Sequence, residues 1–192
     1  MSVWPSSSGE FDINRTVLSN DINRLLVNNA HWTREYILIS AYEAGELEAV
    51  ADQLVQSAVN MARFFGGYYG QERAAVLESL LSVYNYYAIR TIDALRANDP
   101  QQAEEMRREW SDSAEAIAQF MSEQNRNIDQ YALQALFQNL IELTEEEATQ
   151  VFSGEYAASI EKYMEIIDYV VNMAWDISSA ISNVVRPDLP KF

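Results

Sequence analysis

Apolar residues recur along most of the chain at intervals of three and four, which is the spacing of one face of an α-helix. The clearest runs are Met61, Phe64, Phe65 and Tyr68 in one segment, and Ile117, Phe120 and Met121 in another. The sequence has no sustained alternation of apolar and polar residues and no Asn-Gly or Asp-Gly hairpin turn, which are the signals of strands. The pattern therefore predicts an all-α fold.

Three short sites have the composition of helix ends. At Gly45-Glu46, Asn98-Asp99 and Gly154-Glu155, a residue that tolerates a positive φ is followed directly by an acid. Gly and Asn end helices in the left-handed conformation, and an acid is favourable at the start of the next helix. Pro100 and Gln102 add a first-turn proline and a capping-box contact to the second site. The sites are about 53 and 56 residues apart, the length of one helical hairpin.

Superposing the three units on these turns aligns apolar residues on both sides of each turn. After the turns, the residues that coincide are Met61, Ala114 and Val170; Phe64, Ile117 and Met173; Phe65, Ala118 and Ala174; and Tyr68, Met121 and Ile177. Before the turns, they are Val27, Leu80 and Leu136; Ile39, Ile92 and Ala148; and Tyr42, Leu95 and Val151. We therefore expect an antiparallel helical bundle of about six long helices, built as three pseudo-repeated helical hairpins.

Glycine and proline give the expected boundaries of this bundle. Gly66, Gly67 and Gly70 indicate a break between the first two hairpins. Pro187 and Pro190 end the last periodic run. We expect one domain over residues 12–186, a flexible N-terminal tail at 1–11 and a C-terminal tail at 187–192.

The charge balance narrows the classes of partner. The chain has 29 acidic and 13 basic residues, a formal net charge of −16 and a pI near 4.3. A surface of this sign repels nucleic acids and anionic lipid headgroups, so we expect neither as a partner. The N-terminus lacks the basic and apolar regions of a signal peptide, and no apolar run is long enough to span a bilayer. We therefore expect a cytoplasmic protein, with secretion by a route that reads no N-terminal signal left open.

Few residues are suited to catalysis or metal binding. Cysteine is absent and His31 is the single histidine, which excludes thiolate catalysis, Cys-ligated zinc and a His-rich metal cage within one chain. A lone histidine on a mostly apolar face is most simply a core residue, although Glu35, one turn away, could orient it. In the repeat register, His31 coincides with Tyr84 and Leu140.

The charged residues have structural explanations that compete with functional ones. The run Glu145-Glu146-Glu147 is expected to be a solvated face. Asp168, which lies inside an apolar run, should either face water or pair with an arginine. Arg34 and Arg90 lie near aromatic residues and are candidates for half-buried pairing with acids, with anion recognition as the alternative.

Many short collinear motifs are similar to those of an uncharacterised bacterial family of helical-bundle proteins. They are Trp32-Thr33-Arg34, Tyr68-Tyr69-Gly70, Trp110 with Glu115-Ala116-Ile117-Ala118, Asn125 to Asn127, Leu143-Thr144 with Glu147-Ala148, Gly154-Glu155-Tyr156-Ala157-Ala158, and Arg186-Pro187-Asp188 to Phe192. The resemblance runs from about residue 22 to the end and implies a helical bundle without an assigned activity.

The resemblance also implies a polar site that this chain has lost. In the family, the first helix of each hairpin has a Glu-His pair and the last helix has His-x-His, which resembles an inward-facing metal ligand set. The corresponding residues here are Asn28-Asn29, Val83-Tyr84, Asn139-Leu140, and Ile167 with Tyr169. None of them keeps the pattern, so we transfer no ligand role and expect no metal and no cofactor.

Two functional hypotheses follow. The first is a non-enzymatic acidic bundle that acts by association, with itself or with another protein. The second is a small-molecule or metal-ion binding protein with a pocket in the bundle core, lined by His31, Glu35, Tyr84 and Tyr169. An enzyme would have to use carboxylates and tyrosines alone, and this is the least supported interpretation.

Overall fold

A computed structural model describes residues 8–42 and 45–182, with side chains from residue 16 onward. The described chain contains six α-helices and no strand. They are α1 (Ser8–Ala41), α2 (Leu47–Tyr69), α3 (Gln71–Arg96), α4 (Pro100–Gln124), α5 (Gln130–Phe152) and α6 (Tyr156–Ile181). The predicted all-α bundle is confirmed. Residues 8–11, which we expected in the N-terminal tail, are the first residues of α1, and the C-terminal tail at 187–192 lies outside the described residues.

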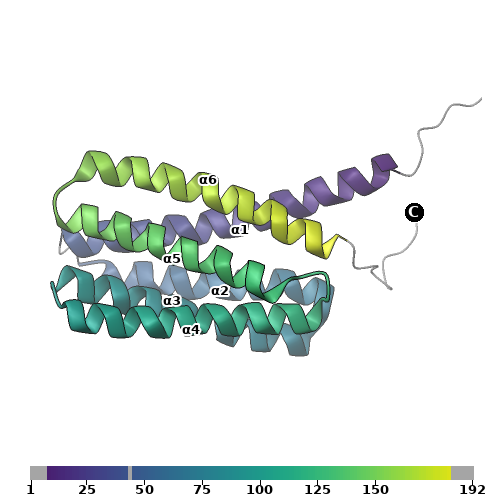
Figure 1. The fold of residues 1–192 in the computed structure, drawn as a ribbon, viewed down its shortest axis with the longest axis horizontal. Helices are drawn as coiled ribbons and strands as arrows, with labels where there is room; N and C mark the ends of the chain where they lie inside the picture. Colours follow the sequence, from purple (N-terminus) through teal and green to yellow (C-terminus); the bar gives the residue numbers. More distant parts are fainter. Residues whose placement is uncertain (1–7, 43–44, 183–192) are drawn as a thin grey trace, which may run out of the picture.

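The helices are arranged as three antiparallel hairpins: α1 with α2, α3 with α4, and α5 with α6 (Figure 1). Each hairpin also packs against the next one, and α1 packs against α6, so the first and last helices close the bundle. At 34 residues, α1 is the longest helix, and its N-terminal part extends past the end of α6 (Figure 1). None of the helices, over the residues described, is long and apolar enough to cross a membrane.

The second and third hairpin turns have the predicted conformation. Asn98 has φ 53° and Gly154 has φ 76°. In both turns the chain closes a Schellman motif, in which the N–H of the next residue (Asp99 or Glu155) donates to a carbonyl five residues earlier. The Asp99 carboxylate then accepts from the Gln102 N–H at 3.0 Å and caps α4. The first turn includes residues 43–44, which lie outside the described residues.

The repeat register predicted for α1 is wrong by two residues. The connections after α3 and α5 have three residues each, 97–99 and 153–155, whereas the connection after α1 has five, 42–46. Because this turn has two extra residues, an alignment made on the turns pairs each residue of α1 with the wrong residues of α3 and α5, two positions away from its true equivalents. With this displacement, equivalent positions of the three helices are buried in every hairpin: Ile22, Leu77 and Leu133; Leu26, Leu81 and Phe137; Thr33, Ala88 and Thr144; and Ile37, Ile92 and Ala148. The predicted match of Val27 with Leu80 and Leu136 is replaced by one of Leu25 with the same two residues.

The predicted glycine-rich break is a single residue. Gly66 and Gly67 lie inside α2, and only Gly70, at φ 92°, separates α2 from α3. Gly66 is buried because α3 passes close to it: a Cβ built on Gly66 would lie 2.8 Å from the Cβ of Ala74. The glycine therefore allows two helices to approach closely beside their connection.

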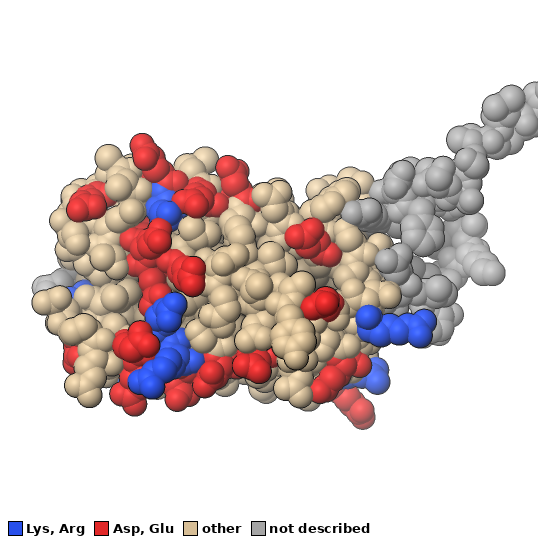
Figure 2. Space-filling view, in the orientation of Figure 1, with Lys and Arg blue, Asp and Glu red and all other residues tan. Residues whose placement is uncertain are grey.

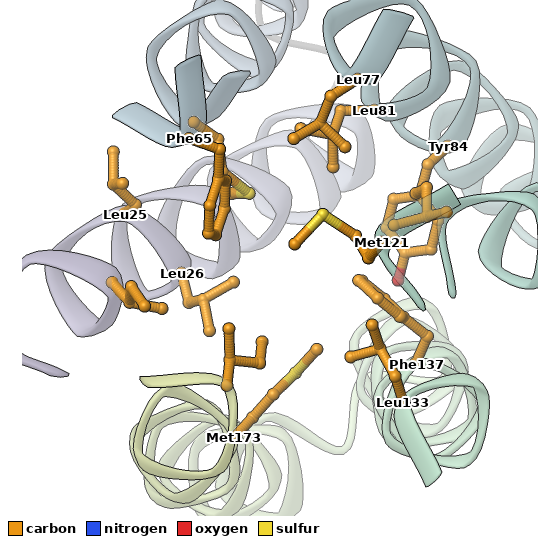
Figure 3. Close-up of a cluster of buried hydrophobic side chains, with 14 of the residues drawn as sticks. Leu25, Leu26, Phe65, Leu77, Leu81, Tyr84, Met121, Leu133, Phe137 and Met173 are labelled. Carbon is orange, nitrogen blue, oxygen red and sulfur yellow. The ribbon is translucent and has the colours of Figure 1, made fainter. Parts of the chain in front are cut away.

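The core runs along the bundle axis and contains side chains from all six helices. Figure 3 shows its larger cluster, in which leucines of α1, α3 and α5 surround Phe65, Met121, Phe137 and Met173. A second cluster, around Ile37, Leu54 and Val151, fills the end of the bundle where the hairpins turn. This apolar interior fixes the helices against each other and determines which polar side chains are enclosed.

Candidate functional site

The most polar part of the interior is a small cavity within the larger core cluster. All six helices contribute to its lining, and its polar side chains are Asn29, Tyr84, Asn85, Thr144 and Glu147, with Thr33 and Trp110 beside them. Its volume is about 30 Å³, which is the room of about one water molecule. The cavity is therefore too small for an organic ligand.

Two amide side chains on the cavity wall, of Asn29 and Asn85, are hydrogen-bonded to their neighbours. The Asn29 amide N–H donates to the Ser57 hydroxyl at 2.7 Å and to the Asn85 side-chain oxygen at 3.2 Å. The Asn85 amide N–H donates to the Leu54 carbonyl at 2.8 Å. These bonds join α1, α2 and α3, so the amides stabilise the packing of these helices.

Two other polar groups in this layer have no hydrogen bond within the described part of the chain: the Tyr84 hydroxyl and the Trp110 indole N–H. Their rings lie edge to face with centroids 5.5 Å apart, and Tyr84 packs in the same way on Phe137 (Figure 3). Burial raises the pKa of the Tyr84 phenol. The nearby Trp110 indole lowers this pKa by a smaller amount, so the pKa stays above its ordinary value. The phenol therefore stays neutral and is not suited to act as a base or nucleophile.

An ion pair between Arg34 of α1 and Glu147 of α5 lies at the edge of the cavity. The side chains are only 13% and 2% exposed. The guanidinium also lies 4.5 Å from the centre of the Tyr163 ring and donates to the Ser159 carbonyl at 3.3 Å. Burial raises the pKa of Glu147 to about 7, although Arg34 lowers it. The prediction that Arg34 pairs with an acid is confirmed, whereas Glu147 is not part of a solvated face.

Of the other two acids in the Glu145–Glu147 run, Glu146 is exposed and Glu145 is half-buried. Arg107 of α4 bonds Glu145 at 2.8 Å, and Lys162 of α6 bonds Glu146 at 2.7 Å. Figure 2 shows this region as a band of blue and red side chains that crosses α4, α5 and α6. The band joins neighbouring helices through ion pairs, which is a structural role.

The four residues predicted to line a core pocket do not come together. Only Tyr84 reaches the cavity. His31 is exposed on the outer side of α1, with its ring 5.2 Å from that of Trp32, so it is not the core residue that we expected. The Tyr169 hydroxyl donates to the Leu136 carbonyl at 2.9 Å, and Glu35 is half-buried outside the cavity.

The positions singled out by the family resemblance are only partly brought together. Asn29, Tyr84 and Leu140 line the cavity. Because the connection after α1 is two residues longer than the others, Asn29 and not His31 is the residue of α1 equivalent to Tyr84 and Leu140. Val83 and Asn139 are exposed. In the described ranges, no group of three or more His, Asp or Glu side chains is placed to hold a metal ion.

The most unusual surface feature, which the sequence analysis missed, is a second apolar face on α6. Besides its core face, α6 has large apolar residues spaced four, four, three, four and four apart, which we call the α6 stripe: Tyr156, Ile160, Met164, Ile167, Val171 and Trp175. Apart from the half-buried Ile167, they are between 41% and 56% exposed. At about 1.5 Å per residue, the stripe is about 28 Å long.

The surroundings of the α6 stripe extend its apolar character at one end and are acidic along its length. Tyr42, which directly follows α1 and is also exposed, stacks on Tyr156 with ring centroids 6.3 Å apart. Glu161 and Asp168 directly follow two stripe residues, so they lie about 100° around the helix and form one border. Both are exposed, which confirms the first alternative for Asp168.

Comparison with known proteins gives no relative: no family model, no curated protein and no solved structure matches this chain. The resemblance to an uncharacterised bacterial family therefore stays a prediction.

Proposed function

We propose that this chain is a non-enzymatic protein that acts by association, and that the α6 stripe is its docking face. The observation that supports the proposal best is the run of five large apolar side chains on one helix, each about half exposed. Single exposed apolar residues are ordinary, but a continuous stripe of them marks interaction surfaces. Tyr and Trp, present at both ends of the stripe, are typical of such surfaces.

The alternative of a ligand pocket in the core has less support. The cavity has room for about one water, and its amides are already bonded to other side chains. The ionisable groups in this layer are a neutral phenol and a carboxylate paired with Arg34. A site of this size and chemistry is better suited to an enclosed water molecule than to a substrate.

The test compares substitutions on and off the α6 stripe. The stripe variant, Ile160→Glu with Val171→Glu, places two negative charges on the stripe. The α2/α3 variant is the control: it places the same two charges at exposed valines of α2 and α3, by Val55→Glu and Val76→Glu. All four sites are exposed, so both double variants should fold. Affinity capture from the cells that make the protein, quantified by mass spectrometry, should yield a partner with the wild type and the α2/α3 variant but not with the stripe variant. Equal capture by all three proteins would refute the proposal.

The cytoplasmic and bacterial setting expected from the sequence belongs to the same proposal. Fractionation of the producing cells, with the protein detected by antibody, tests the location. Recovery in the extracellular medium would contradict it.

A further inference from the structure

We infer that the partner of the α6 stripe is an amphipathic helix with apolar residues at the same spacing and with basic residues along its border. The inference rests on the proposed function and adds the chemistry of the partner. Three observations support it: the shape of the stripe, the charges along it, and the cost of the competing occupant.

The shape of the stripe matches a helix. Its residues follow one line along a straight α-helix, with gaps of three and four, so the exposed face is narrow and about 28 Å long. A second helix laid against this line places its own residues of the same spacing into the gaps. A partner helix of about five turns would cover the stripe from Tyr156 to Trp175.

The described charges beside the stripe are acidic. Glu161 and Asp168 form the outer border on α6. Lys162 does not balance them, because it bonds Glu146 of α5 and Glu165. A partner with Arg or Lys at its flanking positions would meet opposite charge at Glu161 and Asp168.

Arg24 of α1 lines a groove between α1 and α2 together with Asn28, Asn60 and Arg63. Its positive charge lies at that groove, and Glu161 and Asp168 are the charges that α6 itself places beside the stripe.

A second copy of the chain fits the apolar spacing but not the charges. The spacing is the same in both directions, so two antiparallel α6 helices would place Tyr156 against Trp175, Ile160 against Val171 and Met164 against Ile167. The same two-fold arrangement places the acidic border of one copy against that of the other, and each copy has a net charge of −16. Like charges oppose this pairing at low salt.

The experiment uses two labelled helical peptides of about 21 residues. Both have leucines at the spacing of the stripe; one has Arg and the other Glu at the flanking positions. Fluorescence anisotropy should show binding of the basic peptide at micromolar concentration, weakened about tenfold between about 50 and about 500 mM salt, and no binding of the acidic peptide. Binding should be lost in I160E/V171E, although this variant is more acidic and would bind an unspecific cation more tightly.

Matched charge variants locate the interaction. E161Q/D168N should weaken binding of the basic peptide by about threefold to tenfold and reduce its dependence on salt. E78Q/E105Q, which removes two exposed acids from α3 and α4, should leave the affinity within about twofold of wild type.

Each other result overturns the inference. Equal binding of the two peptides would mean that the stripe docks helices without regard to charge, which leaves the proposed function standing. Failure of both peptides to bind would also overturn the inference, and the capture experiment then decides the proposed function separately. Dimerisation of the wild type in sedimentation experiments as salt is raised would make a second copy the occupant.

Discussion

Arg34 and Glu147 are 113 residues apart in the sequence and form an ion pair inside the bundle. The pair connects the first helix to the fifth at the edge of the polar cavity, and Tyr163 of the sixth helix lies against the guanidinium. A buried ion pair has a large desolvation cost, so it contributes little net stability while intact but makes the loss of one partner costly.

Removing one partner of this pair should therefore destabilise the fold far more than removing both. We expect Arg34→Met to lower the free energy of unfolding by about 3 to 5 kcal/mol, because it leaves a buried carboxylate unpaired. The double variant R34M/E147M should recover most of this loss. Urea unfolding of the wild type, both single variants and the double variant gives the coupling energy. A double variant as unstable as the sum of the single ones would contradict the expectation.

Glu147 should also make stability depend on pH. Its pKa is about 7 in the folded protein and 4.5 ordinarily, so the folded state binds the proton more tightly than the unfolded chain. The stabilisation from this group is complete below about pH 4.5 and is lost as the pH rises through 7, by at most about 3 kcal/mol. Relative to Glu147→Gln, the wild type should lose stability between pH 5 and pH 8 in chemical denaturation. A gain over this range would mean that pairing with Arg34 outweighs burial.

Two adjacent glycines of α2 provide a matched test of helix packing. Alanine at Gly66 would place its Cβ 2.8 Å from the Ala74 Cβ, so α2 and α3 must separate, and we expect a loss of about 1 to 3 kcal/mol. Nothing lies within 4 Å of a Cβ at Gly67, so Gly67→Ala should instead stabilise the helix by up to about 1 kcal/mol. Thermal unfolding followed by circular dichroism distinguishes the two. Equal effects would show that helix propensity, and not the approach of α3, determines both.

The left-handed residues of the turns should tolerate glycine but not alanine. Asn98→Ala and Gly154→Ala place an ordinary side chain at φ 53° and 76°, which we expect to cost about 1 kcal/mol each. Asn98→Gly keeps the conformation and should lie within about 0.5 kcal/mol of the wild type. Urea unfolding measures all three. Equal stability of the Ala and Gly variants at residue 98 would mean that the turn changes conformation.

The local signals of the sequence were sufficient to predict the helices and two of the turns. Apolar spacing of three and four, together with Asn98 and Gly154, determines where helices run and end, because both depend on neighbours in the chain. The conformation of these turns and the Asp99 cap agree with the prediction. The position of Gly66 inside α2 could not be predicted, because it depends on the approach of α3.

The candidate site was less predictable, because it depends on which helices lie beside each other. Glu147 has the same local sequence signal as Glu146, but it faces Arg34 from a helix far away in the chain. The α6 stripe has the same apolar spacing as a core face, and it is exposed because α1 and α5 cover only part of α6. Burial of a given face is a property of the assembled bundle, and the spacing of residues in one helix does not determine it.

The five-residue connection after α1 has a consequence for how an internal repeat persists over evolution. The two additional residues are accommodated in the loop, so α1 turns the same face to the core as α3 and α5 do. Asn29, and not His31, therefore occupies the position equivalent to Tyr84 and Leu140. Loop insertions cost little, so the spacing between repeats can change while the helix faces that build the interior are kept.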